Sequence, residues 1–322
     1  MKIIEPSAHI VDEINGKDLL RKIEVCGRVC YRSEDKITED SAEKFVAMLI
    51  KRGHESVLEH ANIIIQMDEN TANRISQSLI NDDVDYPINP ICLRHTAVDY
   101  RWIFSGNVRA WRDYFRFANP YSIPHELIAF FRQHSFHKLW DDVLGVFAPC
   151  KDTGNLKEIT EFNELKTTYE QEAHWCVTVK FVTDRGISHE IVRHRPASYS
   201  QESTRYVNYG GKDIEVIQPV ELTGQKQRRE WLETALLACN SYRYLISLGT
   251  TPQNARSVLP TCLATTLYMT ANLHEYKHFF KMRTAQAAHP DMRRIAIPLQ
   301  QEFKQEFPKV FDRRADKDEG WK

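Results

Sequence analysis

The residues best suited to chemistry lie close together, between Arg193 and Arg205. Within these thirteen residues the chain carries three arginines, one histidine and three serines. An arginine guanidinium is a planar fork of donors that can grip a phosphate, and serine hydroxyls complete the hydrogen bonding of a bound anion. Charge alone would also fit a solvated turn, but the short hydroxyl residues and Pro196 differ from the Glu/Lys mixture of an ordinary exposed face. We therefore predict an anion-binding segment.

The overall charge is balanced, so an anion must be bound by such a local group of arginines. The 322 residues include 43 Lys and Arg and 44 Asp and Glu, which gives a net charge of −1. A balanced chain has no global field that attracts nucleic acid or an anionic membrane. No window reaches the roughly 18 to 20 continuous apolar residues of a membrane span, and the first residues lack a signal-peptide pattern. We expect a cytoplasmic protein without a nucleic-acid or membrane partner.

The seven cysteines are predicted to be reduced thiols. Their number is odd, they form no C-x-x-C pair, and most of them sit within apolar stretches. This usage is typical of a reducing compartment.

A helix and a strand are predicted on either side of a second polar group, which begins at His54. Residues 40–53 have apolar side chains at the spacing of one helix face, and Gly53 suits the C′ position after the helix. Residues 61–67 predict a buried strand.

The arginine-rich segment is predicted to follow a strand and a short helix. Alternating apolar residues predict a strand over 175–181 that stops at the turn 184–186. Ser188 would then cap a short helix that carries Glu190 to His194.

Two more arginines are predicted to lie on or at the end of helices. A helix over 226–247 would end at Gly249, after which Thr251 and Pro252 would open a short helix that carries Arg256.

Following a strand over 265–271, Asn272 and Glu275 form a capping-box pattern for a helix that ends at Arg283. The last helix opens at Pro290 and should kink at Pro298.

The middle of the chain is rich in proline and has two helix-like pieces, near 105–118 and 124–140. It has no Gly/Ser linker, so we interpret it as an insertion packed on one domain. Its prolines are Pro87, Pro90, Pro120, Pro124 and Pro149.

Several blocks of residues together resemble the flavin-dependent thymidylate synthases. Arg193-His194-Arg195, seven residues and Ser203 match the R-H-R-x7-S signature of that family, and Ser203-Thr204-Arg205 matches its S-x-R ending. The further blocks that resemble the family, in its order along the chain, are Cys26 to Cys30, Gly53 to Ser56 with Glu59-His60, Arg256 to Pro260, and Asn272 with Arg283.

The resemblance implies an α+β fold in which helices flank an antiparallel sheet. It implies one domain over residues 1–322, with an insertion at about 68–173 to which no family block assigns a role. It also implies a homotetramer with active sites at subunit interfaces. The expected reaction is the methylation of dUMP to dTMP, with 5,10-methylenetetrahydrofolate as carbon donor, FAD as hydride carrier and NADPH as reductant.

The resemblance also assigns residues to ligands. The dUMP residues would be Glu190, Arg193, Gln201, Ser203, Thr204, Arg205, Arg256 and Arg283. The FAD residues would be His54, Ser56, Glu59, Arg193, His194, Arg195, Gln201, Asn272 and His278. Arg283 would be catalytic, because a fixed cation at the uracil ring stabilises the negative charge that makes C5 reactive.

The sequence departs from compact members of the family at five positions of these blocks. Cys30, Ser56, Glu190, His274 and His278 stand where compact members have Ser, Thr, Gln, Arg and Asn. In addition, Asn107-Val-Arg109 followed by Trp111 and Phe115 echoes the segment that begins at Asn272. Short matches of this kind arise readily by chance, and we interpret this one so.

Other enzymatic chemistries fit the sequence less well. A cysteine-dependent thymidylate synthase needs a Pro-Cys-His-Gln setting, whereas Pro149-Cys150 continues into Lys151-Asp152. Ser203 has no recognisable Asp-His relay beside it. The histidines at 54, 60 and 194 lack the spacing of metal ligands, so we predict no metal site.

Two further functions stay open at this point. One is a flavin- and folate-dependent methylation of uracil in RNA, and the other is a non-enzymatic nucleotide- or RNA-binding protein. Neutral charge and the lack of a basic stripe with interleaved aromatics argue against RNA. The preference for NADPH over NADH and the order of methylene and hydride transfer also stay open.

Overall fold

The computed structural model describes residues 1–11, 18–80, 93–98, 101–134, 139–150, 156–211 and 213–312. The chain divides into two compact units, which are described separately. Unit 1 comprises Met1–Glu13, Val25–Ile37 and Val177–Lys322, and unit 2 comprises Ile14–Glu24 and Thr38–Cys176.

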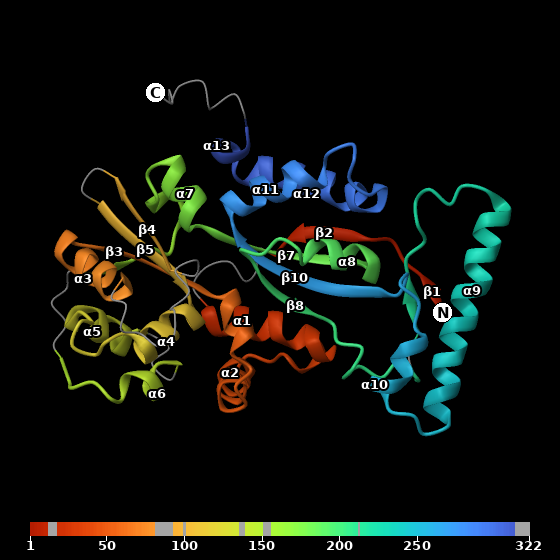
Figure 1. The fold of residues 1–322 in the computed structure, drawn as a ribbon, viewed down its shortest axis with the longest axis horizontal. Helices are drawn as coiled ribbons and strands as arrows, with labels where there is room; N and C mark the ends of the chain where they lie inside the picture. Colours follow the sequence, from red (N-terminus) through yellow and green to blue (C-terminus); the bar gives the residue numbers. More distant parts are fainter. Residues whose placement is uncertain are drawn as a thin grey trace. The chain divides into compact units, whose positions relative to one another are not determined.

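Unit 1 is built on a four-stranded sheet with the order β2-β7-β10-β8, whose strands run side by side in Figure 1. Strand β2 pairs antiparallel with β7, and β10 pairs antiparallel with β8. Nearly every residue of β10 is buried, as expected for a central strand that is covered on both faces. The strands are β2 (Ser7–Ile10), β7 (Cys176–Asp184), β8 (Ser198–Gln201) and β10 (Ala264–Asn272), and a parallel two-stranded ladder joins β1 (Lys2–Ile3) to β9 (Glu215–Val216).

Helices pack on this sheet, and aromatic side chains form contacts between the helices. Helix α12 packs along β2, where the backbone N–H of Ile10 donates to Oε1 of Glu302 over 2.9 Å. The Phe303 ring lies between Tyr276 and Phe311, with ring centroids 4.6 and 5.3 Å away. The helical segments are η2 (Val29–Tyr31), η3 (Glu34–Lys36), α8 (Arg185–Ile191), α9 (Gln225–Ser247), α10 (Pro252–Ala255), η7 (Arg256–Val258), α11 (Leu273–Arg283), α12 (Pro290–Glu306) and α13 (Pro308–Phe311). Helix α1 (Leu19–Arg28) has residues in both units.

Unit 2 has its own four-stranded sheet, with the order β4-β5-β3-β6 and antiparallel neighbours throughout. Its strands are β3 (Asn62–Met67), β4 (Leu93–Val98), β5 (Arg101–Asn107) and β6 (Lys157–Glu158). Its helical segments are α2 (Ser41–Lys51), η4 (Glu55–His60), α3 (Glu69–Ile80), α4 (Val108–Phe117), α5 (His125–Gln133), α6 (Asp141–Leu144), η6 (Phe162–Glu164) and α7 (Thr168–His174).

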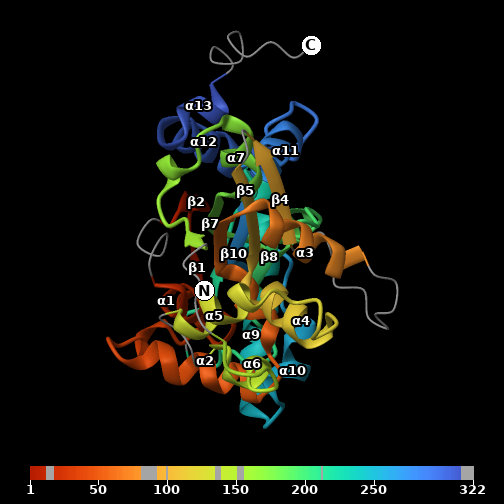
Figure 2. The same cartoon turned by 90° about the vertical axis from the view of Figure 1, so that its left-hand side faces the viewer.

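Aromatic side chains fill the core of unit 2 between α4, α5 and α6, which lie together in Figure 2. Trp111, Phe131 and Trp140 are fully buried, and the ring centroids of Phe131 and Trp140 are 4.5 Å apart. Burying such rings removes a large apolar area from water and so stabilises the unit. The predicted α+β class, with helices flanking antiparallel sheets, is confirmed.

Glycine ends two of the predicted helices, as expected. Helix α2 stops at Lys51, and Gly53 has φ +69°. The N–H of Gly53 donates to Ile50 and that of His54 to Leu49, which is the Schellman pattern. Gly249, with φ +85°, follows α9 in the same way. The predicted strands over 61–67, 175–181 and 265–271 correspond to β3, β7 and β10.

The predicted cap of the helix before the arginine-rich segment is wrong. The N-cap is Asp184, whose Oδ1 accepts from the N–H of Ile187 over 2.9 Å. The helix therefore begins at Arg185, where a turn was predicted, and Ser188 lies inside it with its hydroxyl bonded to the Arg185 carbonyl. It also ends at Ile191 rather than His194.

Three other predictions needed adjustment. The piece predicted over 105–118 begins as strand β5 and becomes helical only at Val108, because Asn107 caps α4. The piece over 124–140 ends as α5 at Gln133, with residues 135–138 outside the described part. Arg256 is the C-cap of α10 rather than a residue within it. Helix α12 runs through Pro298, and the predicted kink there stays a prediction.

Two predictions from composition concern the state of the cysteines and the lack of a membrane-spanning segment. Six cysteines are free thiols there, whereas Cys92, Pro87 and Pro90 lie outside them. Within the same ranges, no helix combines the length and apolar character needed to cross a bilayer.

His174 should make the stability of the protein fall in acid. It is fully buried, and its ring nitrogens hydrogen-bond the hydroxyls of Thr96 and Ser105 over 2.8 and 2.7 Å. Burial, with the charges of Arg94 and His95, lowers its pKa to about 3. The unfolded value is about 6.5, so the folded state binds fewer protons. The stabilisation is complete above about pH 6.5 and is lost as the pH falls from there towards 3.

The measurement is the free energy of unfolding in denaturant at about pH 7 and about pH 5. His174→Asn should reduce the pH dependence of the free energy of unfolding by up to about 1.4 kcal/mol per pH unit, the value for one proton. His125→Asn is the control, because His125 is exposed on α5. Equal slopes for wild type and His174→Asn would contradict the prediction.

Candidate active site

Arg283, the predicted catalytic residue, is held by Glu190, a predicted dUMP residue, and by His194, a predicted FAD residue. Its Nη1 donates to Oε2 of Glu190 over 2.7 Å, and its Nη2 donates to the Glu190 carbonyl over 2.7 Å. Its Nε donates to Nε2 of His194 over 2.9 Å. A guanidinium has five N–H donors, and these bonds use three of them. Within the described residues, two donors of Arg283 are therefore left for a ligand.

His194 is a neutral acceptor in this cluster. Its ring is buried against Phe279, with ring centroids 5.0 Å apart. Burial, the charge of Arg283 and His278 lower the pKa of His194 to about 4. Because Nε2 accepts from Arg283, the proton of the neutral ring must be on Nδ1. At neutral pH the cluster thus carries one cation and one carboxylate.

The backbone after α8 alternates between buried and exposed side chains. His194 is buried, whereas Arg193 and Arg195 on either side of it are exposed. The Tyr199 hydroxyl fixes this turn by donating to the carbonyls of His194 and Ile191 over 2.6 and 3.0 Å. The two outer arginines can therefore reach a ligand while the histidine holds Arg283.

Of the other predicted dUMP residues in this segment, Gln201 ends β8, and Ser203, Thr204 and Arg205 lie in the turn that follows. The Gln201 amide donates to the hydroxyls of Ser188 and Thr265 over 2.9 and 3.3 Å. Ser203 Oγ accepts from the N–H of Arg205 over 3.2 Å, and Thr204 lies between them. Arg205 is exposed, with its guanidinium carbon 5.4 Å from the centroid of the Tyr206 ring.

Glu202 anchors this turn, although it was not among the predicted site residues. It is buried and accepts a short hydrogen bond from the Tyr209 hydroxyl, and Arg32 Nη1 lies 4.0 Å from its Oε1. Burial raises its pKa, although Tyr209 and the charges of Arg32 and Arg185 oppose that effect. A single acid inside an arginine-rich run was the signal that could have identified it.

Four of the five arginines in the predicted site are exposed and have no carboxylate partner among the described residues. They are Arg193, Arg195, Arg205 and Arg256. Arg228 on α9 is also exposed and without a carboxylate partner there, and its Nε bonds the Leu222 carbonyl. Most arginines that hold the fold are paired instead; Arg283, for example, binds Glu190. An exposed guanidinium without a counter-ion keeps its full capacity for a bidentate bond to phosphate.

The other two FAD residues predicted in unit 1 have different surroundings. Asn272 is the buried N-cap of α11, and its Oδ1 accepts from the N–H of Glu275 over 3.0 Å. His278 is exposed, with its ring centroid 5.6 Å from that of His194. Asn272 thus has a structural role in orienting the helix that ends at Arg283.

The remaining FAD residues, His54, Ser56 and Glu59, belong to unit 2. His54 follows the end of α2, and the other two lie on η4. Glu59 Oε1 accepts from Arg109 Nη1 over 2.7 Å. Arg109 was not among the predicted site residues, although the Asn107 echo pointed to its helix.

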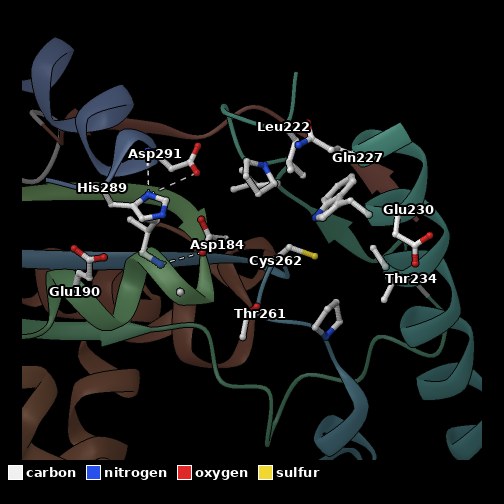
Figure 3. A pocket seen from close by; sticks show the side chains of 17 residues that line it. Asp184, Glu190, Leu222, Gln227, Glu230, Thr234, Thr261, Cys262, His289 and Asp291 are labelled. Atoms are coloured by element: carbon white, nitrogen blue, oxygen red, sulfur yellow. Dashed lines mark hydrogen bonds and ion pairs between the residues drawn. The ribbon is translucent and has the colours of Figure 1, made fainter. Parts of the chain in front are cut away.

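A cavity of about 790 Å³ lies in unit 1 but does not contain the arginine-rich segment. Figure 3 shows α9 on one side of it and Asp184, Glu190 and Asp291 on the other. Its carboxylates, which also include Glu230, would repel an anion. Of the predicted site residues only Glu190 lines it, so we do not assign the nucleotide to this cavity.

Comparisons with known proteins point to one family. The family model described as thymidylate synthase complementing protein, Thy1, matches residues 10–77 and 157–309. The unmatched residues 78–156 form an insertion relative to that model, inside the range predicted from the sequence.

Curated relatives named flavin-dependent thymidylate synthase match a part of the chain. The one from Geobacter sulfurreducens is 37% identical over 128 residues, which are 39% of this chain and 55% of the relative. The one from Pyrococcus furiosus is 31% identical over 122 residues, 37% of this chain and 50% of the relative. The one from Sulfolobus acidocaldarius is 34% identical over 128 residues, 39% of this chain and 48% of the relative. The chain thus spans about half the length of the curated relatives it matches.

Proposed function

The chain belongs to the Thy1 family of thymidylate synthase complementing proteins, and from this premise we propose that it is a flavin-dependent thymidylate synthase. It converts dUMP to dTMP with 5,10-methylenetetrahydrofolate as carbon donor and releases tetrahydrofolate. FAD is the hydride carrier, and NADPH is the reductant.

The observation that supports this function most is the group of exposed arginines in unit 1. Arg193, Arg195, Arg205 and Arg256 are without carboxylate partners in the described ranges, and the hydroxyls of Ser203 and Thr204 accompany them. This donor set fits ligands with several phosphates, as dUMP and FAD have between them. A solvated charged turn would not need a buried Glu202 to hold its shape.

The proposed ligands of the site residues are those that the resemblance implies, and Arg193 and Gln201 serve both dUMP and FAD. The dUMP phosphate is bound by Arg205 and Arg256, with Ser203, Thr204 and Gln201 completing the nucleotide site. The flavin is bound by Arg193, His194 and Arg195, and on unit 2 by His54, Ser56 and Glu59. Glu190 is also a dUMP residue, and Asn272 and His278 are also FAD residues. In addition, Glu190 orients Arg283, and Asn272 caps α11.

Arg283 activates the uracil ring. C5 of uracil is a weak nucleophile, and it becomes reactive when negative charge is drawn towards the ring oxygens. Glu190 and His194 fix the Arg283 guanidinium at the end of α11, and its remaining N–H donors stabilise that charge without a proton transfer. When bound, reduced FAD supplies the hydride that turns the transferred methylene into a methyl group.

The assembly and setting are part of the same proposal. The protein is a cytoplasmic homotetramer with active sites at subunit interfaces, and it has no nucleic-acid or membrane partner. Residues 1–322 form one domain of the family type, which carries its insertion at about 68–173.

The test is product formation by the purified protein reconstituted with FAD. We expect NADPH oxidation coupled to dTMP, with tetrahydrofolate as the folate product, only when dUMP and methylenetetrahydrofolate are both present. Stoichiometric dihydrofolate would instead indicate the cysteine-dependent route. A protein that binds no FAD after reconstitution, or that methylates uracil in RNA but not dUMP, would overturn the proposal.

A further inference from the structure

The junction between β5 and α4 in unit 2 repeats the junction between β10 and α11 in unit 1. Each strand ends at an asparagine, Asn107 or Asn272, with extended backbone (φ −71°, ψ 161° and φ −76°, ψ 167°). Each asparagine Oδ1 accepts from the N–H three residues later, over 2.8 and 3.0 Å. The sequence echo at Asn107 therefore corresponds to the same local geometry, in which an asparagine at the end of a strand caps the helix that follows.

The neighbouring strands repeat the same arrangement. Next to β5 lies β3, which Asp68 directly follows, and next to β10 lies β7, which ends at Asp184. Each aspartate Oδ1 accepts from an N–H three residues later, Thr71 or Ile187, over 2.9 Å. In unit 2 the outer strands β4 and β6 pair antiparallel with β5 and β3, and in unit 1 the outer strands β8 and β2 pair antiparallel with β10 and β7. Helix α4 thus holds the place in unit 2 that α11, with Arg283 at its end, holds in unit 1.

Helix α4 carries a row of arginines that bind the segment with the predicted flavin residues. Arg109 Nη1 donates to Glu59 over 2.7 Å. One turn on, Arg112 is fully buried and its Nε lies 3.4 Å from Oε2 of Glu55, and Arg116 makes two bonds to Glu55, of 2.8 and 2.7 Å. Arginines at this spacing share one face of a helix.

The two carboxylates differ in how deeply they are held. Burial acts against the charge of Glu55, but the hydrogen bonds and charges of Arg116 and Arg112 leave its pKa lowered. The side chains of Glu59 and Arg109 are 27% and 43% exposed, so this pair is still open to a ligand. Glu55 therefore fixes the segment to α4, and Glu59 presents its carboxylate where Arg109 sets its direction.

Because α4 lies in the insertion, the family resemblance assigns it no role. From these contacts we propose that Arg109 is a positioning residue of the flavin site, acting through Glu59. The inference rests on the proposed function, since Glu59 binds FAD only if the protein is the flavin enzyme. It also makes the insertion part of the site rather than a layer packed on it.

The experiment measures FAD affinity of the full-length apoprotein by flavin fluorescence, for wild type, Arg109→Ala and Arg109→Lys. We expect Arg109→Ala to weaken FAD binding about three- to tenfold. The corresponding free energy lies between the contribution of an exposed ion pair and that of a charged hydrogen bond. Arg109→Lys keeps the charge but not the fork, and it should stay within about twofold of wild type.

A double-mutant cycle separates positioning from general destabilisation. If Arg109 acts through Glu59, then Arg109→Ala should cost no more than about twofold in a Glu59→Gln background. Arg74→Ala is the matched control, because the Arg74–Glu126 pair has 33% and 24% exposure in the same unit. It should leave FAD affinity unchanged, and thermal unfolding of all variants checks their folding.

The possible failures are distinguishable. If wild type binds no FAD, the proposed function fails and this inference with it. If wild type binds FAD and Arg109→Ala binds it as tightly, the proposed function stands and the positioning role is wrong. The same conclusion follows if Arg109→Ala loses no more FAD affinity than Arg74→Ala does. If the losses of FAD affinity from Arg109→Ala and Glu59→Gln multiply in the double variant, the positioning role is also wrong, because Arg109 would then not act through Glu59.

Discussion

Arg283→Ala should lower kcat at saturating dUMP by about 10²- to 10³-fold, the usual effect of removing one preorganised donor at a developing charge. Negative charge on the uracil ring grows only as the reaction proceeds, so an interaction with it stabilises the transition state more than the bound substrate. The guanidinium is already fixed by Glu190 and His194, which means that little reorganisation is needed when the charge appears.

The control for this variant is Lys281→Ala, because Lys281 is an exposed cation in the same last turn of α11. It should leave kcat nearly unchanged. FAD content must be compared, since Arg283 also touches His194, a proposed flavin residue. If Arg283→Ala raised KM for dUMP and left kcat unchanged, the activating role would be wrong.

Local elements of the fold were predictable because their signals are local. Gly53 and Gly249 end helices by adopting positive φ, which costs glycine nothing, and this preference depends on a few neighbouring residues. Alternating apolar residues likewise identified β7, whose inward side chains must avoid water. The error at Ser188 arose because two residues could act as caps, and the carboxylate of Asp184, directly after the strand, was the one used.

The candidate site was predictable only where it is contiguous in sequence. The composition of the run from Arg193 to Arg205 is enough to predict an anion-binding segment. By contrast, Arg283 meets Glu190 across 93 residues, and Arg109 meets Glu59 across 50. Such pairs depend on how strands are ordered in a sheet, and no spacing rule along the chain encodes that order.

The role of the insertion illustrates the same difficulty. Its sequence offered no family block, and the echo at Asn107 was too short to weigh against chance. Only the strand order and the shared asparagine cap identify α4 as a repeat of α11. Once α4 is placed there, its arginines and the carboxylates of Glu55 and Glu59 form one ionic network, joined by Asp113, which pairs with both Arg109 and Arg116.

Arg205→Ala should weaken dUMP binding about ten- to a hundredfold, because a charged hydrogen bond to phosphate contributes roughly 1.5 to 3 kcal/mol. Arg205 is exposed, packs over Tyr206 and has no carboxylate partner in the part of the chain that the structure describes. Its backbone N–H is held by Ser203 Oγ, so the turn should survive removal of the side chain. The effect should therefore fall on the ligand and not on the fold.

Comparing dUMP with deoxyuridine isolates the phosphate contact. Calorimetric titration of wild type and Arg205→Ala with each ligand should give a large loss for dUMP and almost none for deoxyuridine, which lacks the phosphate. Arg229→Ala, an exposed arginine on α9 that pairs with Glu233, serves as the control for a general loss of positive charge. Raising the salt concentration should narrow the difference between wild type and Arg205→Ala, because screening weakens an exposed charge pair. An equal loss for both ligands would mean that Arg205 supports the turn or contacts the base, and its assignment to the phosphate would have to be withdrawn.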